Sequence, residues 1–303
     1  MNVNYTFIGG SGRSGTNVLR ELLNKHPDVG SLPFEHRFLI DPDGLVDFIS
    51  HSQDCWSPFM SDNRIKRLEA FLLNLSSKNK KGPYKDWELS RWFPEYNANV
   101  DKLILQLIEF KYEGSWPGIS PCKDMEIWYS SISKQESQMH ISNFIKTNID
   151  QLLIKGSKNH YVEDNTWNIL FFDKILTLMP RSKLIHIVRD PKDVISSYCA
   201  QSWCPKDVIQ STSMYKSIME RWMDVQKKLP KESYLIIKLE DLALNPEFEI
   251  KKVCDFIQLT YHPSLLDMRL DKANIGRYRN FFSIDEVSFI EKETMFIMNE
   301  LGY

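Results

Sequence analysis

The sequence lacks several features that would assign a protein to a class at once. It has no run of about eighteen apolar residues, the length that a membrane-spanning helix needs. No positively charged segment followed by an apolar run opens the chain, so we expect a cytoplasmic protein without a secretory signal. The 38 lysine and arginine residues nearly balance the 40 aspartate and glutamate residues, giving a net charge of −2. The whole-molecule charge therefore does not favour a nucleic-acid partner or an anionic membrane surface.

Cysteine and histidine patterns are equally uninformative. The five cysteines are odd in number and scattered, and none forms Cys-x-x-Cys, which excludes a disulfide framework and a zinc knuckle. The seven histidines show no metal-ligand spacing, so we predict no metal site. We expect the cysteines to be reduced thiols, as is usual in the cytoplasm. Nothing in the sequence predicts an oligomeric state.

Short apolar segments typical of strands alternate with segments of helical periodicity at both ends of the chain. The expected strands are 4–9, 29–33, 160–163, 183–188 and 234–237, and the expected helices are 15–26, 212–228, 246–257 and 284–301. This alternation predicts an α/β fold, with a mainly parallel sheet of four or five strands flanked by helices and a site at the strands' carboxyl ends.

Between about 41 and 155 the pattern changes to helical spacing. Apolar residues recur in this way over 64–75, 100–113 and 137–153, and this stretch also holds five of the eight tryptophans. We therefore expect one domain, 1–303, that carries a helical insertion at about 41–155.

The most informative segment follows the first strand and reads Gly9-Gly10-Ser11-Gly12-Arg13-Ser14-Gly15-Thr16-Asn17. A strand, a glycine-rich turn and a helix start gather backbone N–H groups at the positive end of a helix, which suits a phosphate. Gly10 and Gly15 have the phosphate-loop spacing, but Thr16-Asn17 stands where Lys-Ser/Thr is usual, and the cation is Arg13 instead. The loop thus predicts a phosphate site other than that of an ATP–magnesium complex; the simpler alternative is a plain strand-to-helix turn.

A second segment, Leu184-Ile185-His186-Ile187-Val188-Arg189-Asp190-Pro191, ends a strand with an arginine. Asp190 is a plausible N-cap and Pro191 a first helical residue, whereas His186 is expected in the core. Ser197 follows Arg189 by eight residues, about two helical turns, which would turn it back toward the arginine. The pair predicts a second anion site; the alternative is that Arg189 pairs with Asp190 or Asp193 at the surface.

Together these segments resemble the sulfotransferases that use 3′-phosphoadenosine-5′-phosphosulfate (PAPS), in particular their bacterial and tyrosylprotein-like branch. Gly12 to Asn17 is similar to that family's 5′-phosphosulfate loop, and Arg189 to Ser197 to its 3′-phosphate motif. Leu239-Glu240-Asp241-Leu242 resembles the segment after the last strand, and residues 274–283 resemble a late basic loop over the nucleotide.

The resemblance implies roles for these residues. It implies that the 5′-phosphosulfate is bound by Gly12, Arg13, Ser14, Gly15, Thr16 and Asn17, and that Arg13 is also the catalytic cation. Arg189 and Ser197 would hold the 3′-phosphate, Arg277, Arg279 or Lys272 could close over the nucleotide, and no metal is implied. The acceptor carries a hydroxyl on a saccharide, a peptide tyrosine, a lipid or a small molecule.

A base must deprotonate the acceptor. The segment His26-Pro27-Asp28-Val29 followed by Glu35-His36-Arg37 resembles the part of this branch in which a glutamate is the base, which implies Glu35. His36 is the alternative base. The competing interpretation is that Glu35 only pairs with Arg37.

Three departures from the family pattern keep other functions open. The turn Glu163-Asp164-Asn165-Thr166 lacks an expected lysine, unless Lys155 or Lys158 substitutes; Leu239 stands where an aromatic is expected; and Asn17 replaces a threonine. The alternatives are a kinase on a degenerate phosphate loop and a catalytically inactive nucleotide-binding protein. A kinase would need a lysine after Gly15 and an acidic magnesium ligand at a strand end.

Overall fold

A computed structural model describes residues 3–52, 54–76, 84, 87–114, 125–267 and 275–303. The described residues form two compact units. The first comprises Met1–Pro33, Lys158–Asp173 and Arg181–Tyr303, and the second comprises Phe34–Ser157 and Lys174–Pro180. Lys272, named above as a residue that could close over the nucleotide, lies outside the described residues.

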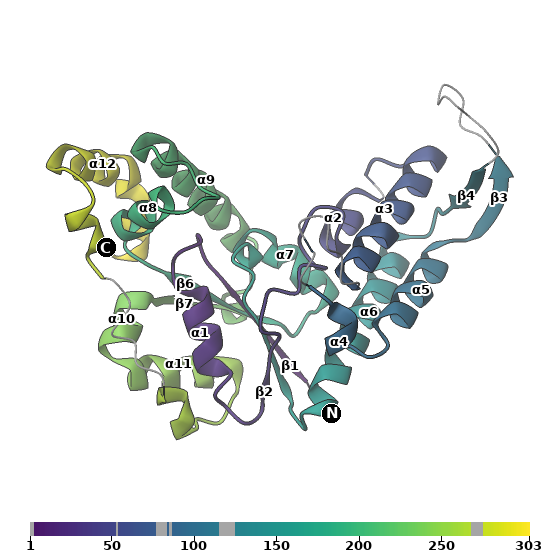
Figure 1. The fold of residues 1–303 in the computed structure, drawn as a ribbon, viewed down its shortest axis with the longest axis horizontal. Coiled ribbons are helices and arrows are strands. Elements are labelled where there is room, and N and C mark those ends of the chain that lie inside the picture. The colour runs from purple at the N-terminus through teal and green to yellow at the C-terminus, as the bar shows by residue number, and fades with distance from the viewer. Residues whose placement is uncertain (1–2, 53, 77–83, 85–86, 115–124, 268–274) are drawn as a thin grey trace. The chain divides into compact units, whose positions relative to one another are not determined.

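The first unit is built on a five-stranded parallel sheet (Figure 1). Its strand order is β2-β5-β1-β6-β7, and the strands are β1 (Asn4–Gly9), β2 (Val29–Gly30), β5 (His160–Glu163), β6 (Lys183–Val188) and β7 (Tyr234–Lys238). The predicted fold class is confirmed: this is an α/β protein whose parallel sheet is flanked by helices.

The central strand β1 lies between β5 and β6. Gly9 pairs with His186 of β6, and Phe7 pairs with Glu163 of β5. Because the three strands run in the same direction, the segments that follow them leave the sheet at one edge. The glycine-rich loop, Arg189 and Asp164 therefore emerge side by side.

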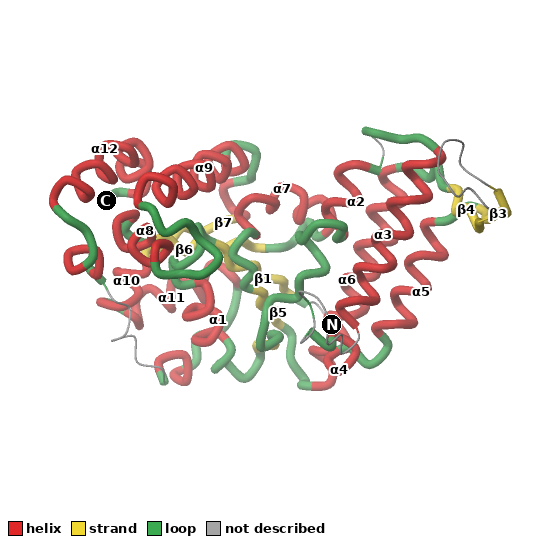
Figure 2. The backbone as a smooth tube through the Cα atoms, turned by 45° about the horizontal axis from the view of Figure 1, so that its top comes forward, coloured by secondary structure: helices red, strands yellow, loops and turns green. Residues whose placement is uncertain are grey.

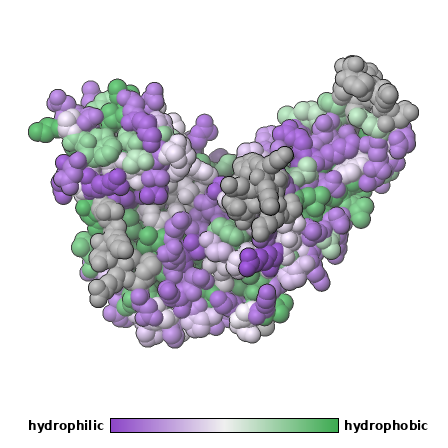
Figure 3. Space-filling model, in the orientation of Figure 1, coloured by the Kyte–Doolittle hydropathy of each residue, from purple (hydrophilic) through white to green (hydrophobic). Residues whose placement is uncertain are grey.

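Helices surround this sheet (Figure 2). They are α1 (Thr16–Leu23), α8 (Pro191–Cys199), α9 (Val208–Gln226), α10 (Leu239–Leu244), α11 (Pro246–Ile257), α12 (Ile284–Leu301) and the start of α7 (Asn168–Leu178), with short 3-10 helices η1 (Lys231–Ser233), η2 (Pro263–Leu266) and η3 (Arg277–Asn280). The predicted start of α8 is confirmed, since Pro191 is its first residue and the Asp190 side chain accepts the Lys192 N–H at 2.9 Å. No helix among the described residues is long and apolar enough to cross a membrane, and hydrophilic residues are interspersed with hydrophobic ones over the visible surface (Figure 3).

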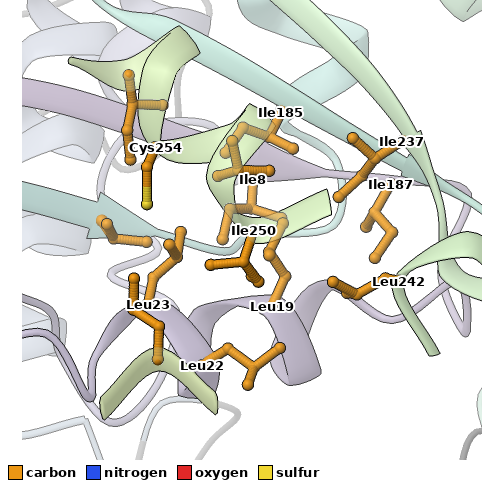
Figure 4. Close-up of a cluster of buried hydrophobic side chains, with 14 of the residues drawn as sticks. Ile8, Leu19, Leu22, Leu23, Ile185, Ile187, Ile237, Leu242, Ile250 and Cys254 are labelled. Carbon is orange, nitrogen blue, oxygen red and sulfur yellow. The ribbon is translucent and has the colours of Figure 1, made fainter. Parts of the chain in front are cut away.

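One face of the sheet is sealed by α1, α10 and α11 (Figure 4). Apolar residues of the strands, such as Ile8 and Ile185, pack against Leu19 of α1 and Ile250 of α11, all fully buried. Burying such side chains stabilises a fold by about 1.5–3 kcal/mol each. This core holds α1, and with it the end of the glycine-rich loop, against the strands.

The second unit contains the expected helices and one unexpected pair of antiparallel strands. Its helices are α2 (Leu45–His51), α3 (Pro58–Ser76), α4 (Leu89–Trp92), α5 (Tyr96–Leu107) and α6 (Lys134–Lys155). The prediction of helix over 100–113 is wrong at its end, because β3 (Phe110–Gly114) pairs antiparallel with β4 (Met125–Tyr129). Phe110 lies opposite Tyr129 with the rings stacked at 4.6 Å, and such cross-strand aromatic pairs favour a sheet.

His186 is a core residue, as predicted. Its ring is fully buried and packs edge-on against Trp222, with 4.6 Å between ring centroids. Burial lowers the pKa of His186 to about 3, and among the described residues neither ring nitrogen has a hydrogen-bond partner. The ring therefore stays neutral at physiological pH.

This burial predicts a pH-dependent stability. As the pH falls from about 6.5 toward 3, His186 binds a proton in the unfolded chain but stays neutral in the folded protein. The contribution of this residue should therefore lower the free energy of unfolding by about 1.4 kcal/mol per pH unit. His186→Leu removes this contribution and should flatten the slope. Urea unfolding at several pH values between about 7.5 and 4.5 measures it; an unchanged slope in the variant would contradict the assignment.

Candidate functional site

The glycine-rich loop adopts a rare backbone conformation. Gly12, Arg13 and Gly15 all have positive φ angles, of 83°, 58° and 108°. Such a conformation is unusual for Arg13, which has a Cβ, and residues of this kind cluster at ligand sites. Helix α1 begins at Thr16, so the N–H groups of its first turn have no acceptor within the helix and face outward with the positive end of the helix dipole. This geometry favours the phosphate site expected from the sequence pattern, which stays a prediction.

Close packing explains two of the glycines. A Cβ on Gly15 would lie 2.8 Å from Leu239 Cδ1, and a Cβ on Gly10 would overlap the Ser14 hydroxyl. Ser14 is fully buried, and its Oγ has no hydrogen-bond partner within the described residues. Buried polar groups usually have partners, so this hydroxyl is a donor suited to a bound anion.

The structure brings the two sequence motifs into direct contact. Arg13 Nε donates a hydrogen bond to Ser197 Oγ at 2.9 Å, and Arg189 Nη1 donates to the Arg13 carbonyl oxygen at 3.3 Å. The Tyr198 hydroxyl also donates to the Ser11 carbonyl oxygen. Arg189 and Ser197, 176 and 184 residues from Arg13, therefore both face the glycine-rich loop.

Arg189 is not a surface residue. Its side chain is 8% exposed and lies 3.5 Å from Asp193, the acidic residue one helical turn further along. The alternative pairing with Asp193 thus exists, but it is buried beneath the loop. Asp190 serves instead to cap α8.

The late basic segment also packs on α8. The 3-10 helix η3 contains Arg277, which is half-buried, and Arg279, which is exposed. The Arg279 guanidinium lies over the Tyr278 ring, with 5.3 Å between Cζ and the ring centroid. The structure therefore brings both arginines to the helix that carries Ser197.

The turn after β5 contains a buried ion pair that the sequence pattern did not predict. Arg20 Nε of α1 lies 2.9 Å from Asp164 Oδ2, and the two side chains are 10% and 3% exposed. Burial raises the pKa of Asp164, although the Arg20 guanidinium opposes this shift. The next peptide is tied to the loop, because Gly10 N–H donates to the Thr166 carbonyl oxygen at 3.0 Å. Asp164 thus fixes the turn in place.

The departure at Leu239 also has a structural explanation. Leu239 is 4% exposed and packs beneath Gly15, so it belongs to the core and presents no face to a nucleotide. Lys158 precedes β5 and lies at the amino edge of the sheet, opposite the glycine-rich loop. It therefore cannot replace a lysine missing from the turn after that strand.

Glu35 belongs to the second unit and is described within it. Its carboxylate pairs with Arg37, and its carbonyl oxygen accepts the Trp87 indole N–H at 2.7 Å. Arg37 also approaches Asp41 at 3.6 Å and lies over the Trp87 ring. The Glu35 side chain remains 21% exposed, so it is held in place but accessible.

His36, the alternative base, has a different environment. It is 1% exposed and stacks on Phe38, with 4.2 Å between ring centroids. Burial, assisted by the Arg37 charge, lowers its pKa to about 3. The buried ring of His36 is therefore much less accessible than the Glu35 carboxylate.

The described residues contain no group of three or more histidine, cysteine, aspartate or glutamate side chains that could hold a metal ion. Backbone N–H groups, hydroxyls and arginines are the donors that this edge of the sheet offers.

Comparison with known proteins identifies the family. The sequence model of the sulfotransferase family matches residues 6–263, so the chain belongs to this family. No curated protein matches the sequence.

A solved structure supports the fold assignment. The sulfotransferase domain of the Synechococcus PCC 7002 olefin synthase is similar with a TM-score of 0.53 and 18% identity over 96% of this chain and 94% of that one. The sulfotransferase domain from the curacin biosynthetic pathway has a TM-score of 0.48 and 16% identity over 100% and 98% of the two chains.

The Arg20–Asp164 pair gives a stability prediction. Arg20→Met leaves the Asp164 carboxylate buried without its partner and should lower the free energy of unfolding by about 3–5 kcal/mol. Adding Asp164→Asn removes that stranded charge, so the double variant should recover part of the loss. Urea unfolding of the set measures this.

Glu21→Gln is the matched control. Glu21 also approaches Arg20, at 3.8 Å, but it is 55% exposed, so its replacement should change stability by less than about 1 kcal/mol. Equal losses for Arg20→Met and Glu21→Gln would show that burial of the Asp164 pair is unimportant.

Proposed function

We propose that this protein transfers the sulfuryl group of PAPS to the hydroxyl of an acceptor. The observation that carries the proposal is the convergence of Arg13, Ser197 and Arg189 at the carboxyl edge of β1 and β6. PAPS has a 5′-phosphosulfate and a 3′-phosphate on one ribose, and two adjoining anion sites suit that pair of groups. Membership of the sulfotransferase family supports the same donor.

The glycine-rich loop binds the 5′-phosphosulfate in this proposal. Backbone N–H groups from Gly12 to Asn17 surround the phosphate, and the hydroxyls of Ser14 and Thr16 add donors. Arg13 contributes its charged guanidinium, whose Nε–H already donates to Ser197 Oγ.

Arg189 and Ser197 bind the 3′-phosphate in this proposal. The arginine fork matches a phosphate with two parallel hydrogen bonds, and the serine hydroxyl supplies a third donor. In this proposal Arg277 and Arg279 of η3, which packs on α8, close over the nucleotide.

The chemistry is an in-line displacement similar to phosphoryl transfer. The acceptor oxygen forms a bond to sulfur while the bond from sulfur to the bridging phosphate oxygen breaks, and Glu35 takes the hydroxyl proton. Negative charge develops on the departing phosphate, where Arg13 and the loop N–H groups stabilise it. The products are the sulfated acceptor and adenosine 3′,5′-bisphosphate.

We further propose that both units act as one sulfotransferase domain, 1–303. The first unit supplies the donor site and the second supplies Glu35 and the acceptor side. Trp87 and Phe34, whose rings lie 5.7 Å apart next to Glu35, suit an acceptor with a ring. Family membership does not favour the kinase alternative, and no lysine follows Gly15.

The donor assignment predicts selective binding. Adenosine 3′,5′-bisphosphate should bind without magnesium and more tightly than AMP, which lacks the 3′-phosphate. Arg189→Lys, which loses the two-pronged contact, should weaken bisphosphate binding by about tenfold or more and leave AMP binding within about twofold. Isothermal titration calorimetry measures both ligands. Binding of ATP only with magnesium, and none of the bisphosphate, would overturn the donor assignment.

The base assignment predicts a separation of binding from turnover. Glu35→Gln keeps the size of the side chain but cannot take a proton, so turnover should fall by about 10²-fold or more while bisphosphate affinity stays within about twofold. Release of bisphosphate from PAPS with saccharide, tyrosine-peptide, lipid and small-alcohol acceptors measures turnover.

Two results would contradict this prediction. Full turnover of Glu35→Gln excludes Glu35 as the base. A wild-type protein that binds the bisphosphate but transfers sulfate to no acceptor indicates a catalytically inactive nucleotide-binding protein.

A further inference from the structure

One buried carboxylate joins the two basic segments of the first unit. Asp193 is fully buried in α8, four residues after Arg189. Its Oδ2 accepts the Gly276 N–H at 2.7 Å, and its Oδ1 accepts the Tyr278 N–H at 3.0 Å. Its Oδ2 also lies 3.5 Å from Arg189 Nη2. Each Asp193 oxygen therefore accepts an N–H of the late basic loop, and Oδ2 also lies beside the Arg189 guanidinium.

The backbone of the late loop is shaped around this carboxylate. Gly276 has a φ of 77°, in the left-handed region, and immediately precedes η3. Two N–H groups, separated by one residue, converge on one anion in this conformation, as in other backbone anion sites. A buried carboxylate with two charge-assisted N–H bonds and a nearby guanidinium is well satisfied.

Neighbouring contacts confirm that the loop is seated on α8. Lys192 Nζ lies 5.2 Å from the centroid of the Tyr278 ring and 2.9 Å from Glu291 Oε1 of α12. These contacts are more exposed than those of Asp193, since the Glu291 side chain is 48% exposed. The buried Asp193 bonds therefore hold the late basic loop on α8, and Lys192 adds a more exposed contact.

We propose that Asp193 is a positioning residue that holds Arg189 and the Arg277–Asn280 turn in one arrangement, so that both act on the 3′-phosphate of the donor. This role rests on the proposed function, because it assumes that Arg189 binds that phosphate. Asp193 touches no substrate itself. It orients the Arg189 guanidinium from one oxygen and fixes the backbone that carries Arg277 and Arg279 from both.

Asp193→Asn tests the role with two ligands. An asparagine of the same size offers only one accepting oxygen and no charge, so the turn loses a bond and Arg189 loses its ionic partner. The Kd of adenosine 3′,5′-bisphosphate should rise by about tenfold or more, the scale of one charge-assisted hydrogen bond, while the Kd of AMP stays within about twofold. For turnover, the KM for PAPS should rise with kcat nearly unchanged.

Limited proteolysis gives a readout that does not depend on the nucleotide. Trypsin cleaves after arginine, and release of the turn should accelerate cleavage after Arg277 and Arg279 in folded Asp193→Asn. Glu291→Gln is the matched control. It removes the ion pair between Glu291 of α12 and Lys192 of α8 and leaves both Asp193 hydrogen bonds intact. It should behave as the wild type in both measurements.

The outcomes separate this role from the proposed function. Absence of bisphosphate binding by the wild type overturns the proposed function and this inference with it. Wild-type bisphosphate binding that Asp193→Asn leaves unchanged, or loses together with AMP binding, overturns the positioning role alone.

Hydrogen exchange on the wild type covers the case in which Asp193→Asn does not fold. The amides of Gly276 and Tyr278 should exchange slowly, and more slowly still with the bisphosphate but not with AMP. Rapid exchange of both amides, or equal protection by the two nucleotides, would overturn the role.

Discussion

The candidate site depends on the parallel pairing of β1 and β6. Hydrogen bonding of these two strands sets Gly9 opposite His186, so the glycine-rich loop and Arg189 leave the sheet at the same edge. The cation of the loop then meets the serine of α8 at 2.9 Å, although 184 residues separate them. The proposed anion site therefore depends on strand register, and the apolar core of Ile8, Ile185 and Leu19 holds that register.

Buried charges fix the segments that surround this edge. Arg20 and Asp164 join α1 to the turn after β5, and Asp193 joins Arg189 to the turn at η3. A buried charge is costly unless it is paired, so each pair allows one arrangement of its segments and disfavours others. The family membership, the left-handed loop and these pairs all support an anion-binding edge built from arginines and backbone N–H groups.

Sequence patterns predicted much of the fold around the candidate site, and their failures have physical causes. The strand, loop and helix at 4–23 and the capped helix at Asp190 were predictable because they depend on local residues, although the helix ends three residues before the predicted 26. The pairing of 110–114 with 125–129 was missed because it joins segments that are separated in the sequence, while apolar spacing up to 113 also fits a helix. Arg20 was missed because an arginine inside an amphipathic helix gives no sign of its distant partner.

The sequence by itself determined the parallel α/β sheet, the glycine-rich loop without a lysine and the spacing of Arg189 and Ser197, since each depends on residues that are close together in the sequence. Only the tertiary structure decided which strand lies beside which, that Leu239 is core and His36 is buried, and that Asp193 receives two N–H groups from a turn more than eighty residues away. These facts depend on burial and on partners distant in sequence, and no local pattern encodes either.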